Sequence, residues 1–177
     1  MLRRHGPAKT NVVDVARRLG MSHANLYRHF ASKVALQDAV AARWLHAIAA
    51  PLAVCAGSDA PAAERLRNWA RMLATAKRQK VLADPEMFAT YHTLAEAARG
   101  VVAAYVTELL AQLERIIVDG TTKGVFRVTN PAAAALAVQN GMMRFHHPYF
   151  VREMATDDAA LETTLDMLVA GLKAGVV

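Results

Sequence analysis

The sequence has little cysteine, glycine or proline, with one Cys, nine Gly and six Pro in 177 residues. A lone thiol, Cys55, cannot form an intramolecular disulfide, which fits a reducing compartment. Few helix-breaking residues beside many alanines favour helix, and no segment keeps up the alternation of apolar and polar residues that is typical of strands. The sequence therefore predicts an all-α protein, and 54% hydrophobic residues are enough to form a buried core.

Long hydrophobic runs are also missing. The longest stretches without charge, Trp44–Ser58 and Val128–Met143, each contain a proline and are shorter than the roughly 20 residues of a membrane span. Met1–Arg4 leads into polar residues rather than into the apolar run of a signal peptide. We therefore expect a soluble, cytoplasmic protein with no membrane partner.

Catalytic and metal-binding signatures are absent as well. The sequence has no G-x-S-x-G, no H-E-x-x-H, no Gly-rich phosphate loop and no cluster of Cys and His. His146 and His147 are adjacent, and adjacent side chains on a helix diverge by about 100°, which suits chelation poorly. We expect a protein that is not an enzyme, with no catalytic residues, no metal site and no cofactor.

Positive charge is in excess, and it is concentrated at one end of the chain. Residues 1–50 hold eight Lys and Arg against two Asp, which accounts for the whole net charge of +6, while residues 51–177 hold thirteen basic and thirteen acidic residues. A solvated basic surface would explain this charge without any motif. A polyanionic partner for the N-terminal part alone explains it equally well. We interpret residues 1–50 as a head domain and residues 51–177 as a body domain.

Helical periodicity recurs along the whole chain and predicts roughly eight helices, three short ones in the head and five in the body. In the head, one helix follows Thr10, a second begins at Ser22, and a third runs from Ser32 to about Ala50. We expect the third helix to stop before Pro51 and residues 51–60 to form a loop. The body helices are predicted near residues 66–76, after 84, at 102–117, at 130–146 and at 156–172.

The head carries the pattern of a helix-turn-helix, in which the second of two short helices enters the major groove of DNA. Apolar residues of Val12–Leu19 would face inward from the first helix, Gly20 suits the tight turn, and Leu26 and Phe30 would anchor the second helix. The outer face of the second helix then holds Asn and Arg, which contact bases, and Ala, which meets the thymine methyl group. The predicted DNA contacts are Thr10, Asn11, Ser22, His23, Ala24, Asn25, Tyr27, Arg28, His29 and Lys33.

The same stretch resembles the DNA-binding head of the tetracycline-repressor (TetR/AcrR) family. Residues 10–36 fit the pattern T-x-V-x-D-V-A-x-x-L-G-M-S-x-x-x-L-Y-x-H-F-x-S-K-x-x-L, in which the run L-Y-x-H-F-x-S-K is highly specific. The resemblance implies a homodimeric transcriptional regulator that binds double-stranded DNA. It also implies that the last two helices of each chain form a four-helix bundle, with a pocket for a small-molecule effector between head and interface.

The sequence departs from the family pattern in two places. Val13 stands where many relatives have a basic residue, so one DNA contact is expected to be missing. Only residues 1–9 precede Thr10, so we expect most of the family's first helix to be absent and the head to be short at its N-terminus.

Methionine and aromatic residues of the body are candidates for the effector pocket, because methionine adapts to varied apolar ligands. Core packing explains any one of them as simply, and His92 is also explained as a surface or core histidine. We interpret the Lys77–Lys80 cluster as a solvated helix face. The candidate pocket residues are Trp69, Met72, Met87, Phe88, Tyr91, His92, Met142 and Phe145.

Two segments of the body are expected at a dimer interface. The Ala-rich segment 130–146 allows close approach of helices, and the Leu stripe of segment 156–172 supplies apolar area, although ordinary core packing is the alternative. The predicted interface residues are Leu136, Gln139, Asn140, Met143, Leu161, Leu165, Leu168 and Leu172.

Together these patterns lead to one leading hypothesis and one alternative. The leading hypothesis is a ligand-responsive repressor that binds a palindromic operator as a homodimer and is released by a small apolar or amphipathic ligand. The alternative is a ligand-binding or interaction dimer whose DNA binding is impaired by the loss of the first helix.

Overall fold

The computed structural model describes residues 22, 28–83, 97–154 and 157–176. Within these residues it contains seven helices and no strand, so the predicted all-α fold is confirmed. The helices are α4 (Lys33–Ala56), α5 (Ala62–Ala83), α7 (Arg99–Thr122), α8 (Pro131–Gly141), α9 (Met143–His146), α10 (Pro148–Glu153) and α11 (Asp158–Ala174).

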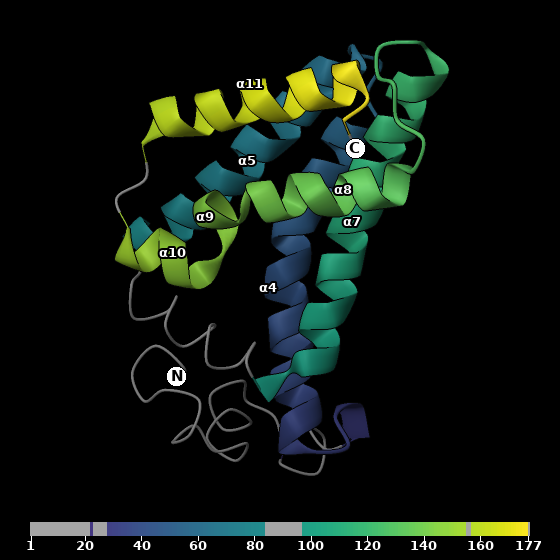
Figure 1. The fold of residues 1–177 in the computed structure, drawn as a ribbon. Helices are drawn as coiled ribbons and strands as arrows, with labels where there is room; N and C mark the ends of the chain where they lie inside the picture. The colour runs from purple at the N-terminus through teal and green to yellow at the C-terminus, as the bar shows by residue number, and fades with distance from the viewer. Residues whose placement is uncertain (1–21, 23–27, 84–96, 155–156, 177) are drawn as a thin grey trace.

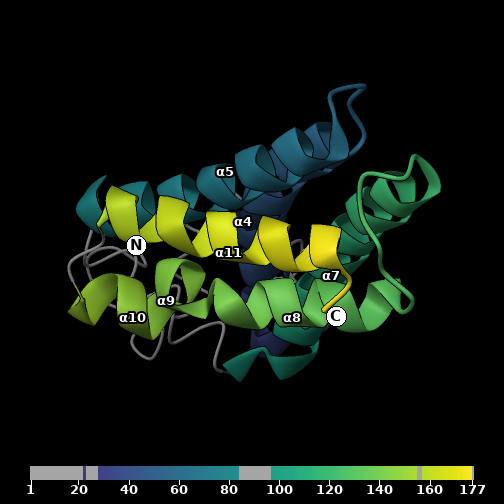
Figure 2. The same ribbon diagram turned by 45° about the horizontal axis from the view of Figure 1, so that its top comes forward.

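Two long helices form a pair, and a layer of other helices lies across one end of that pair. α4 and α7 run side by side, and their N-terminal halves project away from the rest of the described fold (Figure 1). α5, α8 and α11 lie across the other end of the pair, with the short α9 and α10 following α8 (Figure 1). The turned view shows α11 lying between α5 and α8, and it contacts both (Figure 2).

Three of the predicted helix starts are confirmed by side-chain caps. Ser32 Oγ accepts a hydrogen bond from the Ala35 amide at 3.0 Å and begins α4. Asn130 caps α8, with proline at the first helical position, and Asp157 caps α11. Each cap satisfies a backbone N–H that has no partner inside its helix, which is why short polar residues are favoured at these positions.

The predicted stop of α4 before Pro51 was wrong. α4 continues through Pro51 to Ala56, so residues 51–56 are helix and not loop. A proline inside a helix costs roughly 3 kcal/mol, because it removes a backbone hydrogen bond. Residues on both sides of the proline, Ile48 and Leu52, are buried against the rest of the fold, and burial of two such side chains offsets a penalty of that size.

The core lies where the α4–α7 pair meets the layer. It is built from the inward faces of α4, α5, α7, α8 and α11, and the Leu stripe of α11 belongs to it. Its fully buried large side chains include Leu52, Leu66, Trp69, Leu73, Leu109, Leu113, Ile116, Ile117, Phe126, Met142, Leu165 and Leu172.

The buried Arg65 links α5 to two other helices at one end of the core. Its guanidinium donates to the Ala56 carbonyl at 2.9 Å and forms an ion pair with Asp119 of α7. The Ala56 carbonyl belongs to the last turn of α4, where helical carbonyls lack helical donors. Arg65 therefore satisfies the end of α4 while its own charge is paired.

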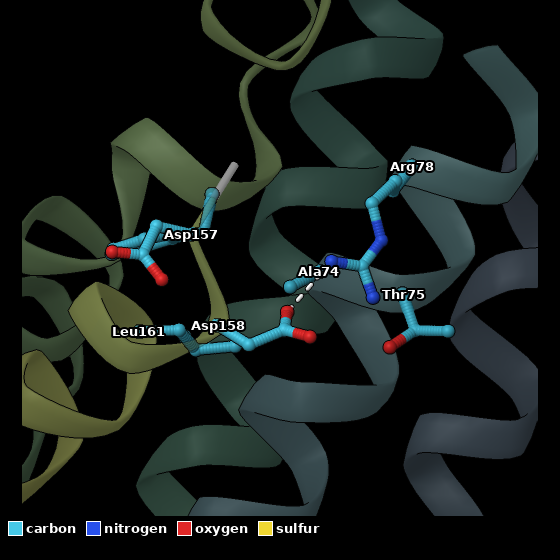
Figure 3. Close-up of a pocket in the computed structure, with 7 residues that line it drawn as sticks. Ala74, Thr75, Arg78, Asp157, Asp158 and Leu161 are labelled. Atoms are coloured by element: carbon cyan, nitrogen blue, oxygen red, sulfur yellow. Dashed lines mark hydrogen bonds and ion pairs between the residues drawn. The ribbon is translucent and has the colours of Figure 1, made fainter. Parts of the chain in front are cut away.

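Ion pairs follow the seam between α5 and α11. Arg67 pairs with Asp166 at 2.7 Å, and Arg71 pairs with Glu162 at 2.6 Å. At the end of the seam Arg78 reaches Asp158 at 2.6 Å beside a small hollow (Figure 3). Most of these side chains are partly exposed, so each pair contributes about 1 kcal/mol or less and mainly fixes how the two helices are aligned.

α4 is long and apolar enough, by length and composition alone, to cross a membrane. One such helix is weak evidence of a membrane span, because core helices of soluble proteins pass the same test. In this fold the buried residues of α4, among them Leu45 and Ile48, pack in the common core with α5 and α7.

Candidate functional site

Part of the predicted DNA-binding segment is described, and residues 28–32 lead directly into α4. Ser22, Arg28 and His29 are exposed, and Lys33 is half-buried in the first turn of α4. Exposed cationic and polar side chains in this position can reach a polyanion. The other predicted contacts, namely Thr10, Asn11, His23, Ala24, Asn25 and Tyr27, lie outside the described residues.

A cavity of about 500 Å³ lies in the body, between the α4–α7 pair and the helices that follow α7. That volume is in the range of sites for drug-sized ligands. Its surface is mainly apolar, with a few polar groups. The described residues that line it are Trp44, Leu45, Lys77, Val102, Tyr105, Val106, Leu109, Leu136, Gln139, Asn140, Met143, His146, His147 and Pro148.

Lys77 is the charged group of this cavity, and it is almost fully buried, with 4% of its surface exposed. Its ammonium group lies 5.4 Å from the ring centroid of Trp44 and 5.0 Å from that of Tyr105. Both distances are within the range of cation–π attraction. Burial lowers the pKa of Lys77 to about 8, because the charged form loses its hydration.

The interpretation of Lys77 as part of a solvated helix face was therefore wrong, although Lys80 is exposed as expected. Lys77 follows Trp69 and Leu73 at intervals of four residues, so it continues the buried stripe of α5. That spacing was visible in the sequence and could have placed Lys77 inside.

Tyr105 and Gln139 bring polar atoms without partners to the same cavity. The Tyr105 side chain is 8% exposed, and its hydroxyl has no hydrogen-bond partner among the described residues. Burial, with a smaller contribution from Glu108, raises the pKa of Tyr105, so the hydroxyl keeps its proton. Gln139 Oε1 is also buried without a partner. Buried polar atoms usually have partners, so these atoms point to a bound group or solvent in the cavity.

His146 adds a neutral imidazole to the wall. Its Nδ1 lies 2.8 Å from the Met142 carbonyl oxygen, and because a carbonyl only accepts, Nδ1 carries the proton. Burial is the main cause that lowers the pKa of His146 to about 4. No group of three or more His, Cys, Asp and Glu suited to a metal ion occurs in the part of the chain that the structure describes.

The residues predicted to line the pocket are placed elsewhere where they are described. Trp69, Met142 and Phe145 are buried in the core, and Met72 is 37% exposed beside a separate groove. The remaining candidates, Met87, Phe88, Tyr91 and His92, lie outside the described residues.

The residues predicted for the dimer interface separate into two groups. Leu136, Gln139, Asn140 and Met143 share one face, and that face lines the cavity. On α11, Leu161, Leu165 and Leu172 are buried in the chain's own core, and Leu168 packs against α8 near Gly141. Periodicity showed that these faces meet something apolar, but a periodic stripe does not distinguish a partner chain, a cavity or the core.

Two known sequence families match this chain. Residues 1–40 match the family described as bacterial regulatory proteins, tetR family, and residues 62–169 match the family described as tetracyclin repressor-like, C-terminal domain. The second match alone spans more than half of the sequence. The chain belongs to the TetR family. The resemblance found at residues 10–36 is confirmed.

Solved structures of TetR-family proteins share this fold. FadR of Bacillus subtilis, in complex with stearoyl-CoA, has a TM-score of 0.69 at 14% identity, covering 96% of this chain and 92% of FadR. PfmR of Thermus thermophilus has a TM-score of 0.58 at 23% identity, covering 99% and 94% of the two chains. AibR, in complex with isovaleryl coenzyme A and operator DNA, has a TM-score of 0.62 at 19% identity, covering 95% and 91%. No curated protein matches the sequence.

Membership in the TetR family makes this protein a transcriptional regulator with a helix-turn-helix DNA-binding domain. TetR regulators are transcription factors rather than enzymes. Repressor activity and homodimers are typical of the family.

Proposed function

We propose that this TetR-family protein is a cytoplasmic, ligand-responsive repressor. A homodimer would bind a palindromic operator, and a small apolar or amphipathic ligand in the cavity would release it. The observation that carries this proposal is that α4 is shared by the two sites. Trp44 and Leu45 form part of the cavity wall, while Lys33 begins the same helix beside the predicted recognition segment.

A ligand can release DNA only if it binds the DNA-competent and the released conformations with different affinity. A cavity with α4 as one wall satisfies this condition, because a shift of that helix changes both the cavity and the placement of the head. FadR and AibR were solved with acyl-CoA ligands, and AibR with operator DNA. Those complexes support ligand response and DNA binding on this fold.

For DNA recognition we propose a head of residues 1–50 that places one recognition helix in the major groove. The two heads of a dimer would reach successive grooves about 34 Å apart. Asn25 and Arg28 would contact bases, and Thr10, Asn11 and Lys33 would contact phosphates. Arg28 is exposed, as this role requires.

For the homodimer we propose the outer face of α8 and α11 as the interface. The Leu stripe of α11 is buried in the chain's own core, so the proposal rests on the opposite side of that helix. Met167 lies there and is 72% exposed, and Gly171 follows one helical turn later, where an added Cβ would meet no neighbour within 4 Å. An exposed methionine beside a small residue permits close packing of a second copy.

The proposal is tested by gel shift and footprinting on the DNA that flanks the protein's own gene. We expect a protected palindrome, and loss of roughly 5- to 100-fold in affinity for Arg28→Ala, which is the range for one base contact. Arg43→Ala is the matched control, because Arg43 is also exposed but lies on α4 away from the recognition segment. Absence of any sequence-specific binding rules out the repressor and leaves the alternative of a ligand-binding dimer.

A further inference from the structure

Lys77 has no counter-charge among the described residues that line the cavity. These residues include no Asp or Glu, and they offer Lys77 two aromatic rings but no ion pair. Cation–π attraction replaces only part of the hydration that a buried ammonium group loses. An anion bound beside Lys77 would supply the missing counter-charge and stabilise the buried ammonium group.

Tyr105 also lines the cavity, and its hydroxyl supplies a second donor. It is buried, protonated and without an acceptor, and the Lys77 ammonium lies over its ring. Two donors on neighbouring side chains of one cavity, one of them charged, match a group with two acceptor oxygens and a negative charge. A carboxylate has that form, and hydrogen bonds to charged groups are about twice as strong as neutral ones.

Most of the remaining lining is apolar. Its apolar side chains include Val102, Val106 and Leu109 of α7, Leu136 of α8 and Met143 of α9. These side chains suit a hydrocarbon chain or a flat ring, and methionine adapts to either. Gln139 Oε1 is an acceptor without a partner, so a ligand with a hydroxyl or N–H group on its apolar part would gain one more hydrogen bond.

We propose that the cavity selects amphipathic carboxylic acids, with the carboxylate bound by Lys77 and Tyr105 and the apolar part enclosed by α7 and α8. This inference rests on the proposed function only in taking the cavity to be the effector site. It specifies the chemical class of the effector.

The direct test is isothermal calorimetry on the full chain with matched probes. Decanoate and naphthoate represent a linear and a flat acid, and their primary amides have nearly the same shape without the charge. We expect each acid to bind about tenfold or more tightly than its amide. Decanoyl-coenzyme A separates a free carboxylate from an anionic phosphate head, and we expect it to bind more weakly than decanoate.

Variants assign the effect to the two donors. Lys77→Met keeps the length and burial of the side chain and should weaken binding of the acids about tenfold or more, with little change for the amides. Tyr105→Phe should produce a smaller loss in the same direction. Lys80→Met is the control, because Lys80 lies on the same helix but is exposed. Circular dichroism and a thermal melt confirm that each variant is folded.

The pH dependence gives an independent signature. In the free wild type, Lys77 loses its proton near pH 8. The affinity of the protein for the carboxylic acids should therefore fall between about pH 7.5 and pH 9.5, and Lys77→Met should abolish this pH dependence. The other titratable groups of the lining are Tyr105 of α7, which stays protonated, His146, whose pKa of about 4 keeps it neutral in this range, and His147.

Equal binding of acids and amides, no binding of either acid at millimolar concentration, or acid binding unaffected by Lys77→Met would each overturn the inference. Tighter binding of decanoyl-coenzyme A than of decanoate would overturn it as well. The proposed function fails on a different measurement, namely operator binding in the gel shift. Acids that bind as expected without changing operator affinity would leave the cavity's selectivity intact and refute the release mechanism.

Discussion

The indole Nε1–H of Trp69 donates a hydrogen bond of 2.8 Å to Oε1 of Gln112, in the centre of the core. The Gln112 amide in turn donates to the Ala49 carbonyl at 3.2 Å. Trp69, Gln112 and Ala49 belong to α5, α7 and α4, so one buried amide connects these three helices.

The first prediction concerns this connection. Gln112→Leu should lower the free energy of unfolding by about 1–3 kcal/mol, because the buried Trp69 N–H is left without an acceptor. The double variant Gln112→Leu/Trp69→Phe also lacks that donor. Its loss in the free energy of unfolding should therefore be smaller than the sum of the two single losses by about 1 kcal/mol. Urea unfolding of the wild type and three variants gives the coupling. Strictly additive losses would show that the bond contributes nothing specific.

The second prediction concerns pH and Lys77. The pKa of Lys77 is about 8 in the fold and about 10.4 in an unfolded chain. Between these values the unfolded chain binds more protons, so this group makes the protein more stable as pH rises through that window, by up to roughly 3 kcal/mol. Below about pH 8, Lys77 is protonated in both the folded and the unfolded chain, and its buried charge lowers the free energy of unfolding by the full roughly 3 kcal/mol.

Lys77→Met should therefore stabilise the protein at neutral pH, and its advantage over the wild type should shrink as pH approaches about 9.5. Chemical unfolding of both proteins at several pH values measures the difference, in which the contributions of Tyr105, Glu108 and His146 largely cancel. A difference independent of pH would mean that Lys77 is not desolvated as described.

The third prediction concerns Gly120 of α7. A Cβ at this position would lie 2.9 Å from the Cβ of Ala62 and closer still to the ring of Phe126. Gly120→Ala should therefore destabilise the fold by about 1–3 kcal/mol, despite the gain in helix propensity. Gly100→Ala, near the start of the same helix, meets no neighbour within 4 Å. It should instead gain about 0.5–1 kcal/mol, and thermal melts of both variants test the contrast.

The fourth prediction concerns the proposed dimer face. Gly171→Arg places a long charged side chain where the isolated chain has open space. The fold should remain intact, while light scattering after size exclusion should show a shift from dimer to monomer. Gly100→Arg, also in open space but on the projecting end of α7, should remain a dimer. A dimer that survives Gly171→Arg with unchanged affinity would place the interface on another surface.

The sequence predicted the fold class, the family and several helix starts, because these depend on local signals. Ser32, Asn130 and Asp157 are caps whose partners lie two or three residues away. The end of α4 depends instead on distant contacts. Pro51 signals a stop locally, but burial of the surrounding turn against other helices overrides that signal.

The candidate site was harder to predict for the same reason. Trp69 and Phe145 have the chemistry of a pocket, yet their position in the core depends on how α5, α7 and α9 cross. Lys77 was the opposite case, because its charge suggested solvent while its helical spacing suggested burial. Which faces of α8 and α11 meet the core or the cavity follows only from the packing of helices far apart in the sequence.

The continuity of α4 through Pro51 has a mechanical consequence. Eighteen residues separate Lys33 from Pro51 on this helix, a distance of about 27 Å at 1.5 Å per residue. Proline removes one bond from the backbone ladder and creates a point at which a helix bends most easily. A tilt of about 10° at that point would carry Lys33 through roughly 5 Å, while Trp44, much nearer the pivot, would move less than half as far. In the proposed function, α4 would act as a lever that turns a small displacement at the cavity into a larger one at the DNA-binding head.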